Sequence, residues 1–131
     1  MTLALRALTR LASWPDLAEA PPNCGTGRAL RSEQSEIVHL HTEQDVDLHL
    51  TVPAIRRLET YLRDETAVRV VPGSDWVTMR LEVDSDIDLL LTLVSAALHA
   101  HRTQPAPADT PSPGCNEHRG MALPRNGFGG N

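Results

Sequence analysis

The sequence predicts an α+β domain with a four-stranded antiparallel sheet made of two hairpins, in the order helix, two strands, helix, two strands, helix. Two pairs of short segments alternate apolar and polar residues with a period of two, which is typical of half-buried strands. Apolar residues recur at helical spacing before, between and after these pairs. The last two helices are expected to cover the apolar face of the sheet, and the amphipathic first helix at most part of the other face.

The first helix is expected over residues 2–14, where apolar residues line one side and arginine, threonine and serine line the other. Pro15 ends this helix, because proline cannot continue it. Residues 20–28 are rich in turn-forming residues and are expected to form a loop. Their Gly25-x-Gly27 pattern lacks the third glycine of a dinucleotide-binding fingerprint and follows no predicted strand, so it does not indicate a phosphate site.

The first hairpin is predicted from residues 36–41 and 45–50, joined by a loop at 42–44. Its register follows from burial, because a slip by one residue would set Leu40 opposite Asp47. The buried face then carries five apolar side chains: Val38, Leu40, Val46, Leu48 and Leu50. The opposite face carries five polar side chains: His39, His41, Asp45, Asp47 and His49.

The middle helix is expected to follow Thr51, which can cap it, with a buried stripe that reaches Leu62. A second hairpin follows, with strands at 67–71 and 76–81. Its connection contains Gly73 as the first residue of a two-residue turn, which indicates type II′. Burial of the apolar positions leaves four side chains on the polar face of this hairpin: Arg69, Trp76, Thr78 and Arg80.

The last helix is expected from Asp86 to about Arg102, with Ser85 opening a variant of the capping box. Its polar stripe is narrow, so this helix should be the most buried of the three. Residues 103–131 are rich in proline and glycine without apolar periodicity, and they are expected to form a disordered tail. Residues 1–102 therefore comprise the domain, a size that one hydrophobic core accounts for.

The composition argues against several classes of function. The net charge of -5 argues against general nucleic-acid binding, which depends on an excess of cations. The chain has arginine but no lysine, so neither Schiff-base chemistry nor a phosphate-loop lysine is expected. Cys24 and Cys115 are far apart and form no CxxC motif, which indicates neither a disulfide framework nor a thiolate zinc site and favours a reducing cytoplasm. No segment is long and apolar enough to indicate a membrane span.

The polar face of the sheet is the candidate site. Five of its side chains are candidate catalytic residues: His39, His41, His49, Asp45 and Asp47. A histidine beside a carboxylate can donate and accept protons near neutral pH, which is the basis of this interpretation. Four more residues are candidate substrate-binding residues: Arg28, Arg69, Trp76 and Arg80. The arginines would hold an acidic group of a small-molecule ligand, and the tryptophan would add one large aromatic surface.

The same face allows a second interpretation, a metal site. The pair His39 and His41 faces an aspartate and a histidine on the neighbouring strand, and imidazoles on adjacent strands can converge on a divalent ion. The spacing matches no standard ligand pattern, and a solvated polar face explains the same residues, so no metal and no cofactor are predicted. Cys24 with a histidine would make a nucleophilic pair, but a single cysteine in a loop is more often inert.

Four segments, residues 27–30, 36–41, 45–50 and 72–77, resemble the small actinobacterial proteins grouped as luciferase-domain proteins. That grouping is similar to the domain of fungal luciferases, which oxidise a hydroxylated pyrone with molecular oxygen and without a flavin. The resemblance covers roughly residues 1–102 and implies a protein that binds or oxidises a small oxygen-rich organic molecule on the polar face. It carries over no catalytic motif.

A shorter resemblance, over residues 74–95, is to the end of YjbR-like proteins, which are associated with DNA binding. The alternative function is therefore a non-catalytic module that binds another protein or DNA. The acidic balance of the chain weighs against the DNA-binding form of this alternative.

Deleting residues 103–131 should leave the thermal unfolding midpoint nearly unchanged, because a disordered tail buries little apolar surface. Calorimetry of the full chain and of residues 1–102 measures the difference. A large loss of stability would show that the tail packs on the domain.

Overall fold

The computed structural model describes residues 2–22, 24–33 and 35–103, so the predicted tail lies outside this range from residue 104 onward. The described helices are α1 (Leu3–Ala12), α2 (Val52–Arg57), α3 (Glu59–Asp64) and α4 (Asp84–Thr103). The described strands are β1 (Ala18–Ala20), β2 (Arg28–Arg31), β3 (Glu36–Leu40), β4 (Asp45–His49), β5 (Val68–Val70) and β6 (Trp76–Arg80). The predicted α+β class is confirmed, but the number and order of the elements differ from the prediction.

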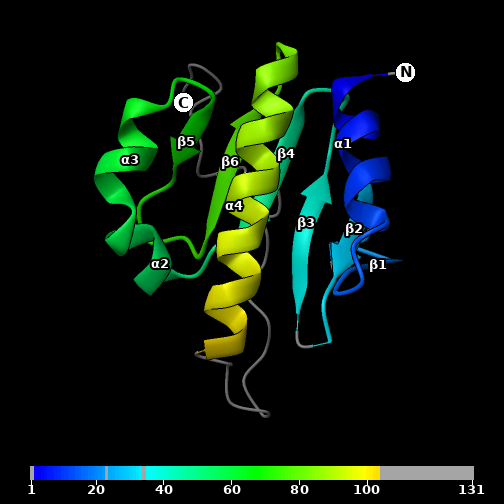
Figure 1. Cartoon of the computed structure of the whole chain (residues 1–131), viewed down its shortest axis with the longest axis horizontal. Coiled ribbons are helices and arrows are strands. Elements are labelled where there is room, and N and C mark those ends of the chain that lie inside the picture. The colour runs from blue at the N-terminus through cyan, green and yellow to red at the C-terminus, as the bar shows by residue number, and fades with distance from the viewer. Residues whose placement is uncertain (1, 23, 34, 104–131) are drawn as a thin grey trace.

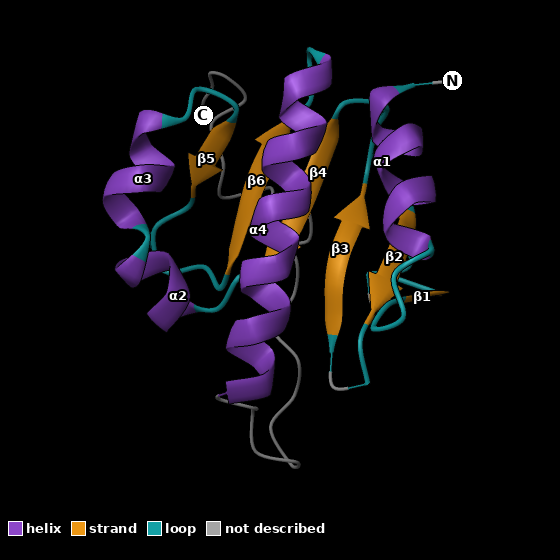
Figure 2. Cartoon of the chain, in the orientation of Figure 1, coloured by secondary structure: helices purple, strands orange, loops and turns teal. Residues whose placement is uncertain are grey.

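The strands form one antiparallel sheet in the order β1-β2-β3-β4-β6-β5 (Figures 1 and 2). The two predicted hairpins are present and are joined by the pairing of β4 with β6. The prediction of a four-stranded sheet is wrong because it lacks β1 and β2. These strands flank the segment expected to be a loop and are too short, at three and four residues, to show a clear period of two. They exist because β3 offers β2 an edge to pair with, and β2 then pairs with β1.

The apolar register of both hairpins is confirmed. Leu40 lies opposite Val46 in the first hairpin, and Val70 lies opposite Val77 in the second. The pairing of β4 with β6 continues the same face, with Leu48 opposite Val77. Val46, Leu48 and Val77 are fully buried, so burial of one face does select the register.

The turn of the second hairpin differs from the predicted type II′. The N–H of Ser74 donates to the carbonyl of Val71 over 3.0 Å, so Pro72 and Gly73 are the second and third residues of the turn. Gly73 has φ +79°, the value that a type II turn requires at its third residue. The reason is that proline, with its φ held near -65°, suits the second position and leaves the positive φ to the glycine that follows.

Helices α1 and α4 lie side by side on the apolar face, with α4 over β3 and β4 and α1 next to β2 (Figure 1). The first helix therefore covers no part of the other face, although the sequence left open that it covers part of it. Its apolar stripe, including Leu8 and Leu11, is buried in the same core as Leu90 and Leu93 of α4. Among the described residues, no helix is both long and apolar enough to cross a bilayer.

Two helix boundaries also differ from the prediction. The middle helix is interrupted at Leu58, whose φ and ψ of -100° and 10° depart from helical values, and so becomes α2 and α3. Thr51 caps α2 as predicted, since its side chain accepts from the N–H of Ala54.

The last helix begins at Asp84, two residues before the predicted start at Asp86. The carboxylate of Asp86 accepts from the N–H groups of the preceding residues 82 and 83, so Asp86, and not Ser85, satisfies the free donors there.

A β-bulge in β3 decides which side chains share a face. Val38 lies opposite Leu30, but Glu36 lies opposite Arg31, so Ile37 is an extra residue without a partner on β2. Both Ile37 and Val38 are fully buried in the core. Because the bulge interrupts the alternation of β3, Glu36 comes to the same side of the sheet as His39, where their side chains are 3.2 Å apart.

The segment that enters β2 is packed tightly on β3. Gly27 has φ +82°, and a Cβ atom at this position would lie 2.1 Å from the backbone oxygen of Leu40 and 3.2 Å from Nε2 of His39. Only glycine allows the backbone to approach β3 so closely. Gly25 has a similar φ of +84°, but a Cβ atom there would meet nothing within 4 Å.

Gly27→Ala should therefore destabilise the domain clearly more than Gly25→Ala. Both changes place alanine at a positive φ, which costs about 1 kcal/mol or more, but only the change at Gly27 adds a clash with the backbone of β3. Urea unfolding of the two variants measures the difference, with Gly25→Ala as the control for backbone strain alone. Equal losses of stability would contradict the close packing of this segment.

Candidate functional site

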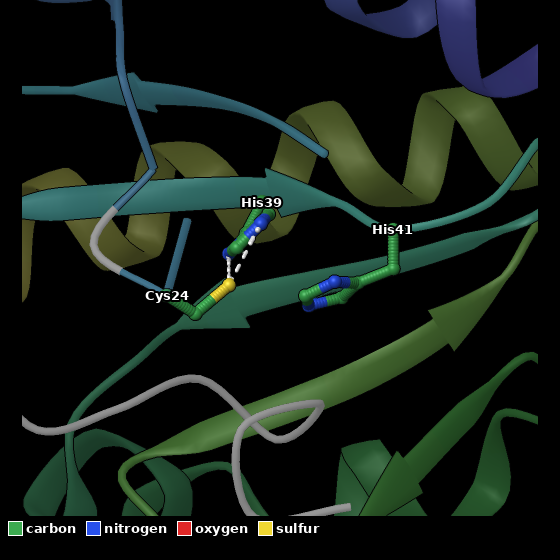
Figure 3. A group of neighbouring side chains, drawn as sticks. All are labelled: Cys24, His39 and His41. Atoms are coloured by element: carbon green, nitrogen blue, oxygen red, sulfur yellow. Dashed lines mark hydrogen bonds between the residues drawn. The ribbon is translucent and has the colours of Figure 1, made fainter. Parts of the chain in front are cut away.

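The side chains of His39 and His41 lie on the face of the sheet opposite α4 (Figure 3). His39 lies directly across from Asp47, and Thr78 of β6 is the next residue along this row. The site is not an open, solvated surface, because His39, Asp47 and Glu36 are only 0%, 2% and 3% exposed. Burying ionisable groups is costly unless they are paired, so the contacts between them determine whether the site is stable.

Two histidine–carboxylate pairs lie side by side in this region, and we call Glu36, His39, His41 and Asp47 the histidine–carboxylate cluster. Nδ1 of His39 is 3.2 Å from Oε2 of Glu36, and Nε2 of His41 is 3.2 Å from Oδ2 of Asp47. The two imidazole rings are 3.9 Å apart between centroids. The hydroxyl of Thr78 donates to Oδ1 of Asp47 over 2.7 Å. Each carboxylate is thus held against one imidazole.

Opposing influences act on the pKa of His39. Burial is the largest and lowers the pKa, while the hydrogen bond to the carbonyl of Thr26 raises it. The neighbouring His41 also lowers the pKa, and the charges of Glu36 and Asp47 raise it. The net effect is a lowered pKa, so the neutral ring is favoured at neutral pH. The surrounding acceptors nevertheless provide partners for a proton when the ring takes one up.

Cys24 also belongs to this region. Its Sγ atom lies 3.4 Å from Nε2 and 3.6 Å from Nδ1 of His39 (Figure 3). One donor atom from each of Cys24, His39 and His41 lies within 4.8 Å of the others, so this trio could hold a metal ion. The sequence did not indicate the trio, because Cys24 lies in the segment before β2 and not on one of the predicted strands. The available signal was the pair of glycines, Gly25 and Gly27, whose positive φ values let this segment fold back onto β3.

His49 lies in a different group. Its ring stacks on Trp76 with centroids 4.7 Å apart and meets the ring of His101 edge-on at 4.4 Å. Nδ1 of His49 donates to the carbonyl of Glu36, and Nε2 of His101 donates to the carbonyl of His49, each over 3.1 Å. The other nitrogen of His101 lies 3.2 Å from the hydroxyl of Ser35. The predicted site residues His49 and Trp76 are thus buried beside α4, where the backbone of Glu36 connects them to the cluster.

The three predicted arginines lie at different places around the sheet. Arg28 forms an exposed ion pair with Glu19, with Nε and Oε2 2.7 Å apart. Arg69 lines a hollow of about 580 Å³ between β5 and the helices α2 and α3. Arg80 pairs with Asp45 over 3.4 Å at the exposed end of the strand pair that carries Asp47. Asp45 and Arg80 therefore share the face of the cluster. Arg69 shares this face too, because it pairs with Thr78 as Asp47 does, but it lies on the edge strand β5; Arg28 lies opposite Leu40 instead.

Comparison with known proteins gives one family. Residues 34–97 match the model of the luciferase domain. No curated protein and no solved structure matches the chain. The luciferase-domain match includes every member of the histidine–carboxylate cluster, together with His49 and Trp76, whereas Cys24 and Gly27 lie before its first residue. It supports the resemblance inferred from the sequence.

The domain should lose stability as the pH falls from about 6.5 to about 4. Burial, and then the charge of His101, lowers the pKa of His49 from 6.5 to about 4. Between these values the unfolded chain binds more protons than the folded chain, so acid favours unfolding, by about 3 kcal/mol from His49 when both limits are reached. Urea unfolding at a series of pH values measures this dependence.

The variant His49→Gln should show a weaker dependence over the same pH range, with the remainder coming in part from His101, whose pKa burial also lowers. His99→Gln is the matched control, because His99 lies on the exposed side of α4 and should leave the slope unchanged. A wild-type stability that is constant across this range would contradict the assignment of a neutral, buried His49.

Proposed function

We propose that the chain is a small luciferase-domain protein that binds a small oxygen-rich organic molecule beside the histidine–carboxylate cluster and transfers protons to or from it. The observation that carries this proposal is the presence of two buried histidine–carboxylate pairs with adjacent rings. The match of residues 34–97 to the luciferase domain supports it.

The chemistry follows from what a histidine held by a carboxylate does. A hydroxylated or enolic molecule reacts with electrophiles such as oxygen more readily once it has lost a proton. A neutral imidazole can accept that proton, and the carboxylate on its other nitrogen stabilises the imidazolium that forms. The side chain of His41 is 6% exposed and that of His39 is fully buried, so the proposal assigns the direct contact with the molecule to His41. Oxidation of the bound molecule by molecular oxygen would then need no flavin.

Recognition of an acidic group on the molecule is assigned to Arg80. Arg80 and Arg69 both share the face of the cluster by register, but Arg80 lies on β6, next to β4, whereas Arg69 lies on the edge strand β5. Arg28 is engaged by Glu19, and Arg69 lines the hollow beside α2 and α3. The proposal therefore retains only one of the arginines that the sequence suggested.

The alternative, a module that binds another protein or DNA, requires a polar face that a macromolecule can reach. The polar side chains of the cluster are buried, so they offer a macromolecular partner little exposed surface. The net charge of -5 also lacks the excess of cations that DNA binding requires.

Thermal unfolding of the full chain, followed with a chelator present, tests the proposal. The compounds added are a panel of hydroxylated aromatic acids and pyrones. A bound compound should raise the unfolding midpoint, since it stabilises only the folded state, by about 2.7 kcal/mol at a concentration 100 times its Kd. His41→Ala should lose at least about tenfold in affinity, because the ring that contacts the molecule and faces Asp47 is removed.

His99→Ala, an exposed histidine on α4, is the control and should bind as the wild type does. Circular dichroism of His41→Ala checks that the domain is folded. A compound that binds wild type and His41→Ala equally well would place its site elsewhere and contradict the proposal.

A further inference from the structure

We infer that Cys24, His39 and His41 form a binding site for a divalent transition metal ion, with zinc as the ion that this donor set suits best. A thiolate and two imidazoles are the ligands that zinc prefers, and three protein ligands leave a fourth position open. The inference goes beyond the proposed function and concerns a separate, metal-bound state, because the one nitrogen of His41 that does not face Asp47 cannot bind an ion and accept a proton from a ligand at the same time.

The spacing of the donors agrees with a tetrahedral site. Zinc lies about 2.3 Å from sulfur and about 2.0 Å from nitrogen, so two such ligands at tetrahedral angles are about 3.5 Å apart. Sγ of Cys24 and Nε2 of His39 are 3.4 Å apart. The third donor comes from His41, and all three fall within 4.8 Å of one another (Figure 3).

The carboxylates are placed as supporting groups of a metal site usually are. A histidine that binds a metal with one nitrogen commonly gives the N–H of its other nitrogen to a carboxylate. Nδ1 of His39 faces Glu36 and leaves Nε2 towards Cys24, while Nε2 of His41 faces Asp47 and leaves Nδ1 for the ion. Binding displaces the proton that Nε2 of His39 now shares with the carbonyl of Thr26, and also the thiol proton.

The charges agree with the same conclusion. Glu36 and Asp47 are almost completely buried near a cysteine that becomes a thiolate when it binds a metal. A divalent cation at the centre offsets this negative charge inside the protein. The segment that carries Cys24 is partly exposed, and its neighbours Gly25 and Thr26 are exposed, so an ion can reach the site from solvent.

A thiol–imidazole nucleophile is the competing interpretation of Cys24 and His39. It accounts for the contact between these two residues, but it assigns no role to His41, whose ring lies 3.9 Å from that of His39 and whose other side is held by Asp47. The metal site uses all three residues and both carboxylates. No metal was predicted from the sequence, because the histidine spacing matches no standard ligand pattern and a solvated polar face explains the same residues.

Titration of the full chain with cobalt(II), with no organic ligand present, tests the inference. We expect about one ion per chain, an intense near-ultraviolet band from thiolate-to-cobalt charge transfer, and the strong visible bands of a four-coordinate ion. Zinc should abolish these bands by competition. Cys24→Ser should lose the near-ultraviolet band, and His41→Ala should weaken cobalt binding at least about tenfold.

Cys115→Ser and His99→Ala are the matched controls and should keep the wild-type spectrum; Cys115 lies outside the described residues. The inference is overturned if the wild type shows no charge-transfer band, or if the band disappears in Cys115→Ser and persists in Cys24→Ser. Rapid alkylation of Cys24 that zinc does not slow would support the nucleophile instead. Because the small-molecule test is run with a chelator, failure of either proposal can be recognised separately.

Discussion

The need to pair buried charges is the constraint on which the rest of this structure depends. Glu36 and Asp47 have almost no exposed surface, and an unpaired carboxylate in such a place would cost several kcal/mol. Each is instead held 3.2 Å from a histidine nitrogen. Such pairs tolerate little displacement, so the strands that carry them must keep one register and one spacing. The polar face thereby imposes on β3 and β4 the same register that their apolar face requires.

Two backbone irregularities make this arrangement possible. The bulge at Ile37 brings Glu36 to the side of His39, where a regular strand would turn it away. The positive φ of Gly27 lets the segment before β2 lie directly on β3, so that Thr26 and Cys24 reach the same imidazole. Both features serve the site more than the core. Departures from regular geometry are often found where a protein positions reactive groups.

The buried histidines are connected through a single residue. The carboxylate of Glu36 contacts His39, while its carbonyl accepts from His49, which in turn stacks on Trp76 and meets His101 of α4. The C-terminal end of α4 is therefore tied to the start of β3 by hydrogen bonds as well as by the apolar core. A change in the protonation of His49 or His101 would alter the electrostatic potential at Glu36, because the low polarity of the interior screens such charges weakly.

The sequence by itself determined the α+β class, the two central hairpins and their apolar register. It did so because alternation such as that of Val46 and Leu48 reports directly which side of a strand must be buried. Tertiary structure decided what the polar residues do. The strands β1 and β2, the bulge at Ile37, and the approach of Cys24 to His39 depend on contacts between segments distant in sequence, which no local period encodes. The separation of His49 from His41 has the same origin, since His101, 52 residues away along the chain, forms the surroundings of His49.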